Sequence, residues 1–242
     1  SSDLETQLET DRRLIGARVK MLQSKLDKLQ RQRATQRRAR ERNHTFSVSL
    51  VGYTNAGKST LFNNMTKAGV YAANQLFATL DTTPRRVHLG EVGNVVVSDT
   101  VGFIRKLPHH LVESFKSTLD EVREADILLH VVDISHPQYE DQMAVVNETL
   151  RELGSGEKPM LTIFNKMDKY ESQTFDEWLE PTTKQEILND LYQRWENETN
   201  GQAVFIAATE KRNLDKLRVT ILEKVKDMYR VRYPYREITI QG

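Results

Sequence analysis

The chain has 242 residues, enough at roughly 150 residues per domain for one sizeable core and an appendage. It contains no cysteine, which excludes a disulfide framework, a thiolate metal site and a cysteine nucleophile. No apolar run approaches the roughly 18 residues that span a bilayer, and the N-terminus lacks the features of a signal peptide. It also lacks an initial Met, so we expect a fragment of a longer protein. The net charge of +1 argues at face value against strong affinity for nucleic acid.

Residues 1–43 predict a long helical arm. Between Asp3 and Arg42 the sequence has no proline and one glycine, so little interrupts a helix. The arm carries 12 Lys and Arg against 6 Asp and Glu, a charge of +6, which leaves −5 for residues 44–242. Seven of the basic residues lie at positions 28–42, where each can neutralise a phosphate of RNA. A heptad-like seam, which predicts a coiled-coil-like helix or helical hairpin, is formed by Leu8, Ile15, Leu22 and Leu29.

Strands and helices are expected to alternate from residue 44 onward. This order is typical of an α/β fold with a mostly parallel six-stranded sheet and helices on both faces. We assign residues 44–230 to this domain and 231–242 to a C-terminal tail, and we expect an excursion at 170–181 between the fifth strand and the following helix. The expected strands are residues 46–51, 85–89, 94–98, 127–133, 160–165 and 203–207. The expected helices are residues 58–67, 111–123, 138–153, 184–198 and 214–229.

The loop after the first expected strand has the pattern of a phosphate-binding loop, Gly-x-x-x-x-Gly-Lys-Ser. Its glycines let backbone N–H groups wrap phosphates, Lys58 meets the β and γ oxygens, and the Ser59 hydroxyl takes a position on Mg²⁺. The helix that follows adds the partial positive charge of its N-terminus. The alternative is an ordinary glycine turn before a helix, but a chance match to the pattern in a chain of this length has a probability on the order of 1%, and the position between a strand and a helix lowers it further. The nucleotide-binding residues predicted here are Gly52, Tyr53, Thr54, Asn55, Ala56, Gly57, Lys58, Ser59 and Thr60.

Two further motifs come at the ends of expected strands. Asp99-Thr100-Val101-Gly102 offers an aspartate that can reach Mg²⁺ through water and a glycine amide that can approach the γ-phosphate. Asn165-Lys166-Met167-Asp168 resembles the guanine-reading motif of the GTPase superfamily. A carboxylate at Asp168 would accept both the N1–H and the 2-amino group of guanine, a pair that adenine lacks. Together with the phosphate loop, these motifs predict a GTP-hydrolysing protein with Lys58 and Gly102 among its catalytic residues.

This order of motifs resembles the translation-factor-related GTPases, and three stretches resemble the HflX family in particular. Residues 5–13 are similar to the segment before that family's helical linker, residues 99–109 to its second switch and residues 129–137 to its fourth strand. The resemblance covers residues 3–169 closely. It implies a cytoplasmic GTPase that binds the large ribosomal subunit and ribosomal RNA and splits or rescues ribosomes. The sequence does not fix the oligomeric state, and we expect a monomer. The resemblance also implies an N-terminal domain before the linker, which we expect to lie outside this sequence.

The resemblance implies a first switch as well. Phe77-Ala78-Thr79-Leu80-Asp81 is similar to that switch and is expected to contact the nucleotide. Thr79 is then a further catalytic residue. It is expected to cap Mg²⁺ in the triphosphate state, beside Ser59 and Asp99.

Three places differ from the commonest GTPase pattern. Phe103 stands where Ras-type GTPases carry the glutamine that orients the attacking water, so we expect slow intrinsic hydrolysis. Asn55 is similar to the potassium ligand of GTPases that use K⁺ in place of an arginine finger, so K⁺ stimulation is a hypothesis; the alternative is that Asn55 only braces the loop. Ala207-Ala208-Thr209 lies where GTPases usually carry Ser-Ala-Lys. The backbone N–H of Ala208 is therefore the group expected to contact the base.

Two alternatives to a ribosome-associated GTPase stay open. The basic run in the arm and the missing glutamine favour an RNA-binding scaffold whose nucleotide is structural. The heptad seam favours a coiled-coil dimerising GTPase, and the basic run can also be a solvated helix face. We expect His109 and His110 to contact a partner or the switch helix, His130 to lie in the core, and Trp178 and Trp195 to be packing residues.

Overall fold

The computed structural model describes residues 35, 45–66, 84–90, 93–103 and 116–234. The chain divides into two compact units, Ser1–Thr45 and Phe46–Gly242. In the first unit Thr35 is helical and exposed. The remainder of the expected arm, residues 1–34 and 36–43, lies outside the described residues.

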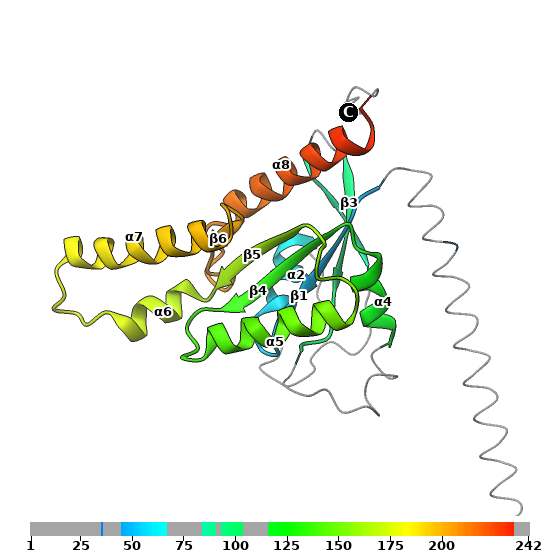
Figure 1. Cartoon of the computed structure of the whole chain (residues 1–242). Helices are drawn as coiled ribbons and strands as arrows, with labels where there is room; N and C mark the ends of the chain where they lie inside the picture. The colour runs from blue at the N-terminus through cyan, green and yellow to red at the C-terminus, as the bar shows by residue number, and fades with distance from the viewer. Residues whose placement is uncertain (1–34, 36–44, 67–83, 91–92, 104–115, 235–242) are drawn as a thin grey trace, which may run out of the picture. The chain divides into compact units, whose positions relative to one another are not determined.

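The second unit contains one sheet whose strand order is β2-β3-β1-β4-β5-β6 (Figure 1). Neighbouring strands are parallel except for the antiparallel pair of β2 and β3, which confirms the predicted mostly parallel sheet of six strands. All seven residues of β4 are buried, as a central strand covered on both faces requires. The strands are β1 (Ser47–Val51), β2 (Arg85–His88), β3 (Asn94–Asp99), β4 (Ile127–Asp133), β5 (Met160–Asn165) and β6 (Ala203–Phe205).

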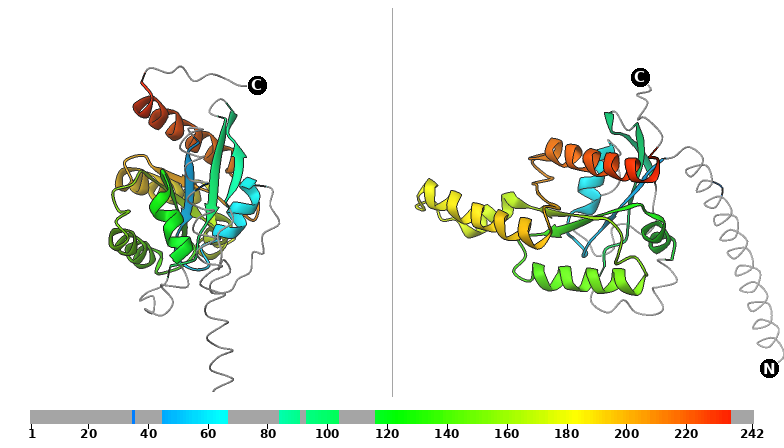
Figure 2. Two further views of the ribbon diagram at one scale, coloured as in Figure 1. Left: turned by 90° about the vertical axis from the view of Figure 1, so that its right-hand side faces the viewer. Right: turned by 45° about the horizontal axis from the view of Figure 1, so that its top comes forward.

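Helices cover both faces of the sheet (Figure 2). The helices are α2 (Lys58–Thr66), α4 (Lys116–Glu124), α5 (Tyr139–Glu152), α6 (Met167–Thr174), α7 (Pro181–Glu198) and α8 (Leu214–Arg232). On one face, α2 and α8 bury Leu61 and Ile221 against alternate strand residues such as Leu129. On the other face, α4 and α5 bury Val122 and Val146 in a second cluster. The two-sided arrangement follows from the period-two alternation of side chains along each strand.

The segment 170–181, predicted as an excursion between the fifth strand and the following helix, is helical over half of its length. The helix α6 runs to Thr174, and after a loop of residues 175–180 the helix α7 begins at Pro181. Proline suits the first turn of a helix because its missing N–H would have no partner there. Figure 1 shows α6 and α7 extending together beyond the carboxyl ends of the strands, with the connecting loop at their far end.

The last strand is shorter than expected. It ends at Phe205 because Ala207 and Arg212 then exchange two backbone hydrogen bonds across a tight turn, with N···O distances of 3.3 and 3.0 Å. The final helix α8 continues to Arg232, three residues beyond the expected end. Within the described ranges, no helix is long and apolar enough to cross a bilayer.

Candidate nucleotide-binding site

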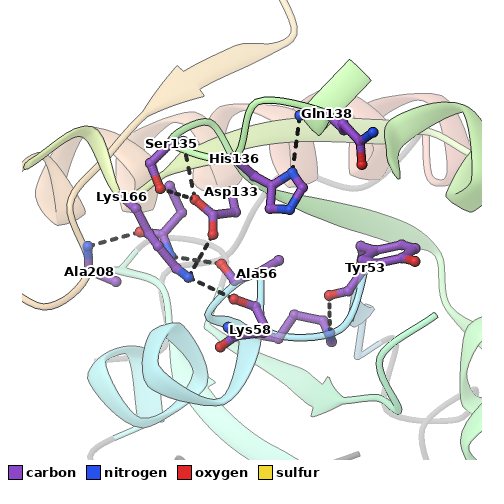
Figure 3. Close-up of polar contacts among 11 residues, drawn as sticks. Tyr53, Ala56, Lys58, Asp133, Ser135, His136, Gln138, Lys166 and Ala208 are labelled. Carbon is purple, nitrogen blue, oxygen red and sulfur yellow. Dashed lines mark hydrogen bonds and ion pairs between the residues drawn. The ribbon is translucent and has the colours of Figure 1, made fainter. Parts of the chain in front are cut away.

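Loops from three different strands are hydrogen-bonded to one another at the carboxyl edge of the sheet (Figure 3). This edge is where parallel α/β sheets bind ligands. The loop after β1 is joined to the residues after β3 by a parallel bridge between Tyr53 and Phe103. It is joined to the end of β5 by the side chain of Asn165, which also contacts the loop after β6 at Ala208. The motifs predicted to share a site are therefore neighbours in space.

Lys58 is buried at the start of α2, directly beneath the phosphate-loop backbone. Its Nζ donates to the backbone oxygens of Gly52 at 3.2 Å and Tyr53 at 3.0 Å. Burial lowers the pKa of Lys58 to about 8, and the nearby charge of Asp99 opposes that shift. Among the described residues no carboxylate contacts this ammonium group, and an ammonium group that is costly to bury is suited to receive an anion such as a phosphate.

Two glycines of the motifs permit close approaches that a side chain would block. Gly57 has φ +92°, and a Cβ placed there would lie 2.3 Å from Nδ2 of Asn165. A Cβ on Gly102 would lie 2.6 Å from the Cα of Thr54. Both positions bring separate loops into contact, which explains why the pattern requires glycine at these places.

The metal-binding residues expected on the described chain lie side by side. The hydroxyl of Ser59 donates to Oδ2 of Asp99 across 2.7 Å, and the Asp99 side chain is buried. A hydroxyl and a carboxylate form the kind of oxygen donor set that Mg²⁺ takes, with its other ligands coming from phosphates and water. These two residues therefore fit the ion that the motifs imply.

Phe103 does not face the site at all. Its ring is 1% exposed and packs in the cluster beneath α4 and α5. Its backbone instead pairs with the phosphate loop: its N–H donates to Gly52 across 3.0 Å, and its carbonyl accepts from Thr54 at 2.9 Å. The sequence predicted only that a phenyl ring cannot orient water. The structure adds that the Phe103 side chain belongs to the core. It therefore contributes no group to the nucleotide site.

Asn165 has its side chain committed to protein contacts on both sides. Its Nδ2 donates to the carbonyl of Ala56 at 3.0 Å, and its Oδ1 accepts from the N–H of Ala208 at 3.0 Å. Asn165 thus braces the phosphate loop against the loop after β6. The N–H of Ala208, expected to contact the base, is the partner of Asn165 instead.

Lys166 makes a contact that the sequence analysis did not anticipate. The residue has φ +68°, and its Nζ reaches Oδ2 of Asp133 at 2.7 Å and the carbonyl of Asn55 at 2.8 Å (Figure 3). The other carboxylate oxygen of Asp133 accepts hydrogen bonds from the N–H and hydroxyl of Ser135. The sequence shows Asp133 only as the last residue of an expected strand, and its register opposite Asn165 comes from the structure.

The remaining residues of the predicted base site differ in accessibility. Met167 is buried in the core beside Trp195, and Ala207 is buried as well. Asp168 is half-buried in the first turn of α6, and Thr209 is exposed. Of this group, Asp168 keeps a charged side chain accessible to a ligand.

The first switch, Phe77-Ala78-Thr79-Leu80-Asp81, lies outside the described residues, and so do His109 and His110. His130 is a core residue as expected: it is 1% exposed, and burial, followed by the charge of Lys58, lowers its pKa to about 4. Trp195 is a packing residue as expected, with 5% exposure. The same prediction is wrong for Trp178, which is 91% exposed.

The fold and the joined loops define a P-loop GTPase-like domain. Residues 47–166 match the family described as "50S ribosome-binding GTPase". A GTP-binding protein from the archaeon Sulfolobus solfataricus, solved with GDP, shares the fold at a TM-score of 0.54 and 23% identity, over 82% of this chain and 58% of that one.

Curated relatives narrow the class. A GTPase HflX from Flavobacterium psychrophilum is 47% identical over 96% of this chain and 57% of its own length. Another, from Lacrimispora saccharolytica, is 56% identical over 68% of this chain and 39% of its own length. The chain belongs to the HflX family of GTPases, and it spans about half the length of these relatives.

Proposed function

We propose that this domain is a Mg²⁺-dependent switch that binds and hydrolyses GTP. The observation that carries the proposal is the double hydrogen bond of Asn165, at 3.0 Å on each side. It fixes the phosphate loop, with Lys58, relative to the end of β5, directly before the first turn of α6 that carries Asp168. Phosphate and base contacts are thereby held at a set separation before the nucleotide arrives, which reduces the ordering that binding requires.

Lys58 would hold the β- and γ-phosphates, and Ser59 and Asp99 would hold the metal. Bound Mg²⁺ supplies neutralisation of the charge that develops on the phosphates. Thr79 would complete the metal site, and the amide of Gly102 would contact the γ-phosphate in the triphosphate state. Loss of that phosphate on hydrolysis would release both segments, as in other nucleotide switches.

Asp168 would select guanine. Its replacement by Asn removes one acceptor and adds a donor, so Asp168→Asn should weaken GTP binding at least tenfold and relax discrimination against xanthosine triphosphate. Affinities for the two nucleotides measured by titration calorimetry test this. Asp190→Asn, an exposed change on α7, is the matched control. Unaltered guanine preference in Asp168→Asn would refute the assignment of the base site.

Hydrolysis by the isolated chain should be slow, because the Phe103 ring lies in the core and the described loops place no glutamine where an attacking water would lie. Asn55 is exposed in the phosphate loop with φ +62°, so its side chain is accessible to an ion. Equal turnover in potassium and sodium buffers would eliminate the proposal that K⁺ assists, and would leave Asn55 as a brace whose carbonyl receives Lys166.

The partner we propose is the large ribosomal subunit, with ribosomal RNA contacted by the basic residues at positions 28–42 of the arm. The family match supports this partner. For the whole protein we propose that it splits or rescues ribosomes in the cytoplasm. A multiple-turnover GTPase assay with and without large subunits tests it. Stimulation favours the switch, whereas binding without stimulation favours an RNA-binding scaffold with a structural nucleotide, the alternative supported by the buried Phe103.

A monomer is proposed for the free chain. The competing possibility is a coiled-coil dimer through the heptad seam Leu8, Ile15, Leu22 and Leu29. Sedimentation equilibrium over a hundredfold range of concentration separates the two. A mass that doubles with concentration, and returns to that of the monomer when Leu22 is changed to Lys, would establish the dimer.

A further inference from the structure

The loop between α6 and α7 exposes the largest apolar side chain on the described surface. Trp178 is 91% exposed and lies in residues 175–180, at the end of the helical pair farthest from the sheet (Figure 1). Tryptophan is the residue type most enriched among those that dominate binding energy at protein interfaces. An exposed tryptophan contributes nothing to the stability of the fold. Binding to a partner would explain why Trp178 is exposed.

The two helices that carry this loop are well anchored. Trp195 of α7 packs on Phe164 of β5 with ring centroids 4.8 Å apart, and Arg194 pairs with Glu140 of α5 at 3.0 Å. On α6, Glu171 pairs with Arg212 at 3.0 Å. The loop is therefore presented by fixed elements, which lowers the entropic cost of using it as a binding surface.

Acidic side chains surround Trp178. Residues 171–190 contain six acidic residues and one basic residue. Asp176, Glu177 and Glu180 are exposed beside Trp178, and within the part of the chain that the structure describes none of the three forms an ion pair. We call Asp176, Glu177, Trp178 and Glu180 the hairpin tip.

We infer that the hairpin tip is a docking site for a basic protein surface that has an apolar pocket for Trp178. The inference rests on the proposed function and places that surface on a protein of the large ribosomal subunit. The charge of the tip decides between the two components of the subunit: RNA phosphates would be repelled by Asp176, Glu177 and Glu180, whereas Lys and Arg side chains of a protein would be attracted. The acidic tip would thus bind a ribosomal protein, and the basic arm would bind ribosomal RNA.

The test is the affinity of the chain, bound to a non-hydrolysable GTP analogue, for purified large subunits at one fixed salt concentration. We expect Trp178→Ala to weaken binding about 10- to 30-fold, as for a central aromatic anchor. Val231→Ala removes another exposed apolar side chain, 83% exposed on α8, and should change affinity less than twofold. Unchanged GTP affinity in Trp178→Ala shows that the domain is intact.

Charge reversal separates protein from RNA as the partner. Asp176→Lys with Glu177→Lys should weaken subunit binding at least tenfold if the partner is basic, and should strengthen it if the partner is RNA. Glu152→Lys with Glu157→Lys makes the same change in net charge on exposed residues away from the tip and is the control. A photoreactive amino acid at position 178 should then label a basic ribosomal protein.

Four other outcomes would each refute a particular part of the inference or of the proposed function. Stronger binding after charge reversal at the tip, or a crosslink from position 178 to ribosomal RNA alone, overturns the protein partner. Wild-type affinity in Trp178→Ala overturns the docking site while the ribosomal partner stands. Failure of the wild-type chain to bind large subunits overturns the proposed partner and this inference together. Self-association that Trp178→Ala abolishes would assign the tip to a second copy of the chain and refute the inference.

Discussion

At the carboxyl edge of the sheet, Lys58, Asp99 and Asn165 are buried and hydrogen-bonded within the site, whereas the polar side chains of the hairpin tip are exposed and form no ion pair with described residues. Asn165 illustrates the first case and Glu177 the second. A nucleotide site gains from groups fixed in advance, since phosphates and base must be met at set positions. A docking site for a charged partner gains from charged groups that stay in solvent. Such groups steer association and cost little free energy in the unbound protein. Changes at the edge should therefore affect stability and nucleotide binding together, and changes at the tip should affect neither.

The largest effect is expected at Lys58. Lys58→Met should weaken GTP binding about a thousandfold, or about 4 kcal/mol, because it removes the buried ammonium that lies against the backbone of Gly52 and Tyr53, where the phosphates are expected. The same change should raise the stability of the nucleotide-free chain, since burial lowers the pKa of Lys58 from 10.5 to about 8 and so disfavours the charged amine. Nucleotide titration and thermal unfolding measure the two effects. Lys169→Met, an exposed change on α6, is the control, and GTP affinity within tenfold of wild type would contradict the assignment.

The second largest effect is expected from a substitution at Asn165. Asn165→Ala removes both of its hydrogen bonds and leaves the carbonyl of Ala56 and the N–H of Ala208 buried without their partner, at about 1–3 kcal/mol each. We expect a loss of about 3–4 kcal/mol in unfolding free energy, measured in urea, accompanied by weaker GTP binding. Asn197→Ala, an exposed change on α7, should stay within about 0.5 kcal/mol. Loss of GTP affinity without loss of stability would show that Asn165 contacts the nucleotide and does not brace the loops.

A pH effect of similar size should come from His130. Its pKa is about 4 in the folded chain, against 6.5 for an unperturbed histidine, because burial and then the charge of Lys58 disfavour the imidazolium. The unfolded chain therefore binds more protons between pH 6.5 and pH 4, and stability falls as the pH drops through that window, by up to about 3 kcal/mol. Carboxylates titrate there too, so the readout is the difference between wild type and His130→Gln in urea unfolding at pH 7 and pH 4. Parallel losses in the two proteins would show that His130 is not the group responsible.

Much of this edge could be predicted from the sequence, because spacing carries the information. Strands 127–133 and 160–165 were predicted with their observed bounds since continuous apolar runs mark strands that are buried on both faces. The phosphate loop and Asn165-Lys166-Met167-Asp168 were found from residue types alone. Contacts that depend on register could not be found: the bond from Lys166 to Asp133 needs the alignment of β4 with β5 and a positive φ at Lys166.

The orientation of individual side chains was the harder part. The sequence predicts only what the Phe103 ring cannot do, whereas its 1% exposure and its place in an apolar cluster show that the ring lies in the core. Trp178 was expected to pack because tryptophan usually does, and the helical conformation of α6, which carries the following loop away from the sheet, was missed. Both cases have one cause: local sequence does not report which tertiary neighbours a side chain meets.

A smaller effect is expected from the pair that the sequence did not reveal. Asp133→Asn removes the negative charge facing Lys166 but keeps an acceptor for Ser135. The side chains of Lys166 and Asp133 are 21% and 11% exposed, so solvent screens the pair in part. We expect GTP affinity to fall about fivefold, or about 1 kcal/mol, as Lys166 loses its hold beside the phosphate loop. Calorimetric titration measures the change, with the exposed Asp141→Asn as control, and an unaltered affinity would make the ion pair incidental.

The smallest effect on stability is expected at the hairpin tip, and it decides whether edge and tip really differ. Trp178 is 91% exposed, so Trp178→Ala should leave the unfolding free energy within about 0.5 kcal/mol of wild type. Trp195, with 5% exposure and its ring 4.8 Å from that of Phe164, is the internal comparison, and Trp195→Ala should cost about 3–5 kcal/mol. Urea unfolding followed by circular dichroism measures both without relying on tryptophan fluorescence. A loss above about 1 kcal/mol in Trp178→Ala would mean that this ring packs against the chain in solution, and the tip would then be part of the fold and not a surface kept free for a partner.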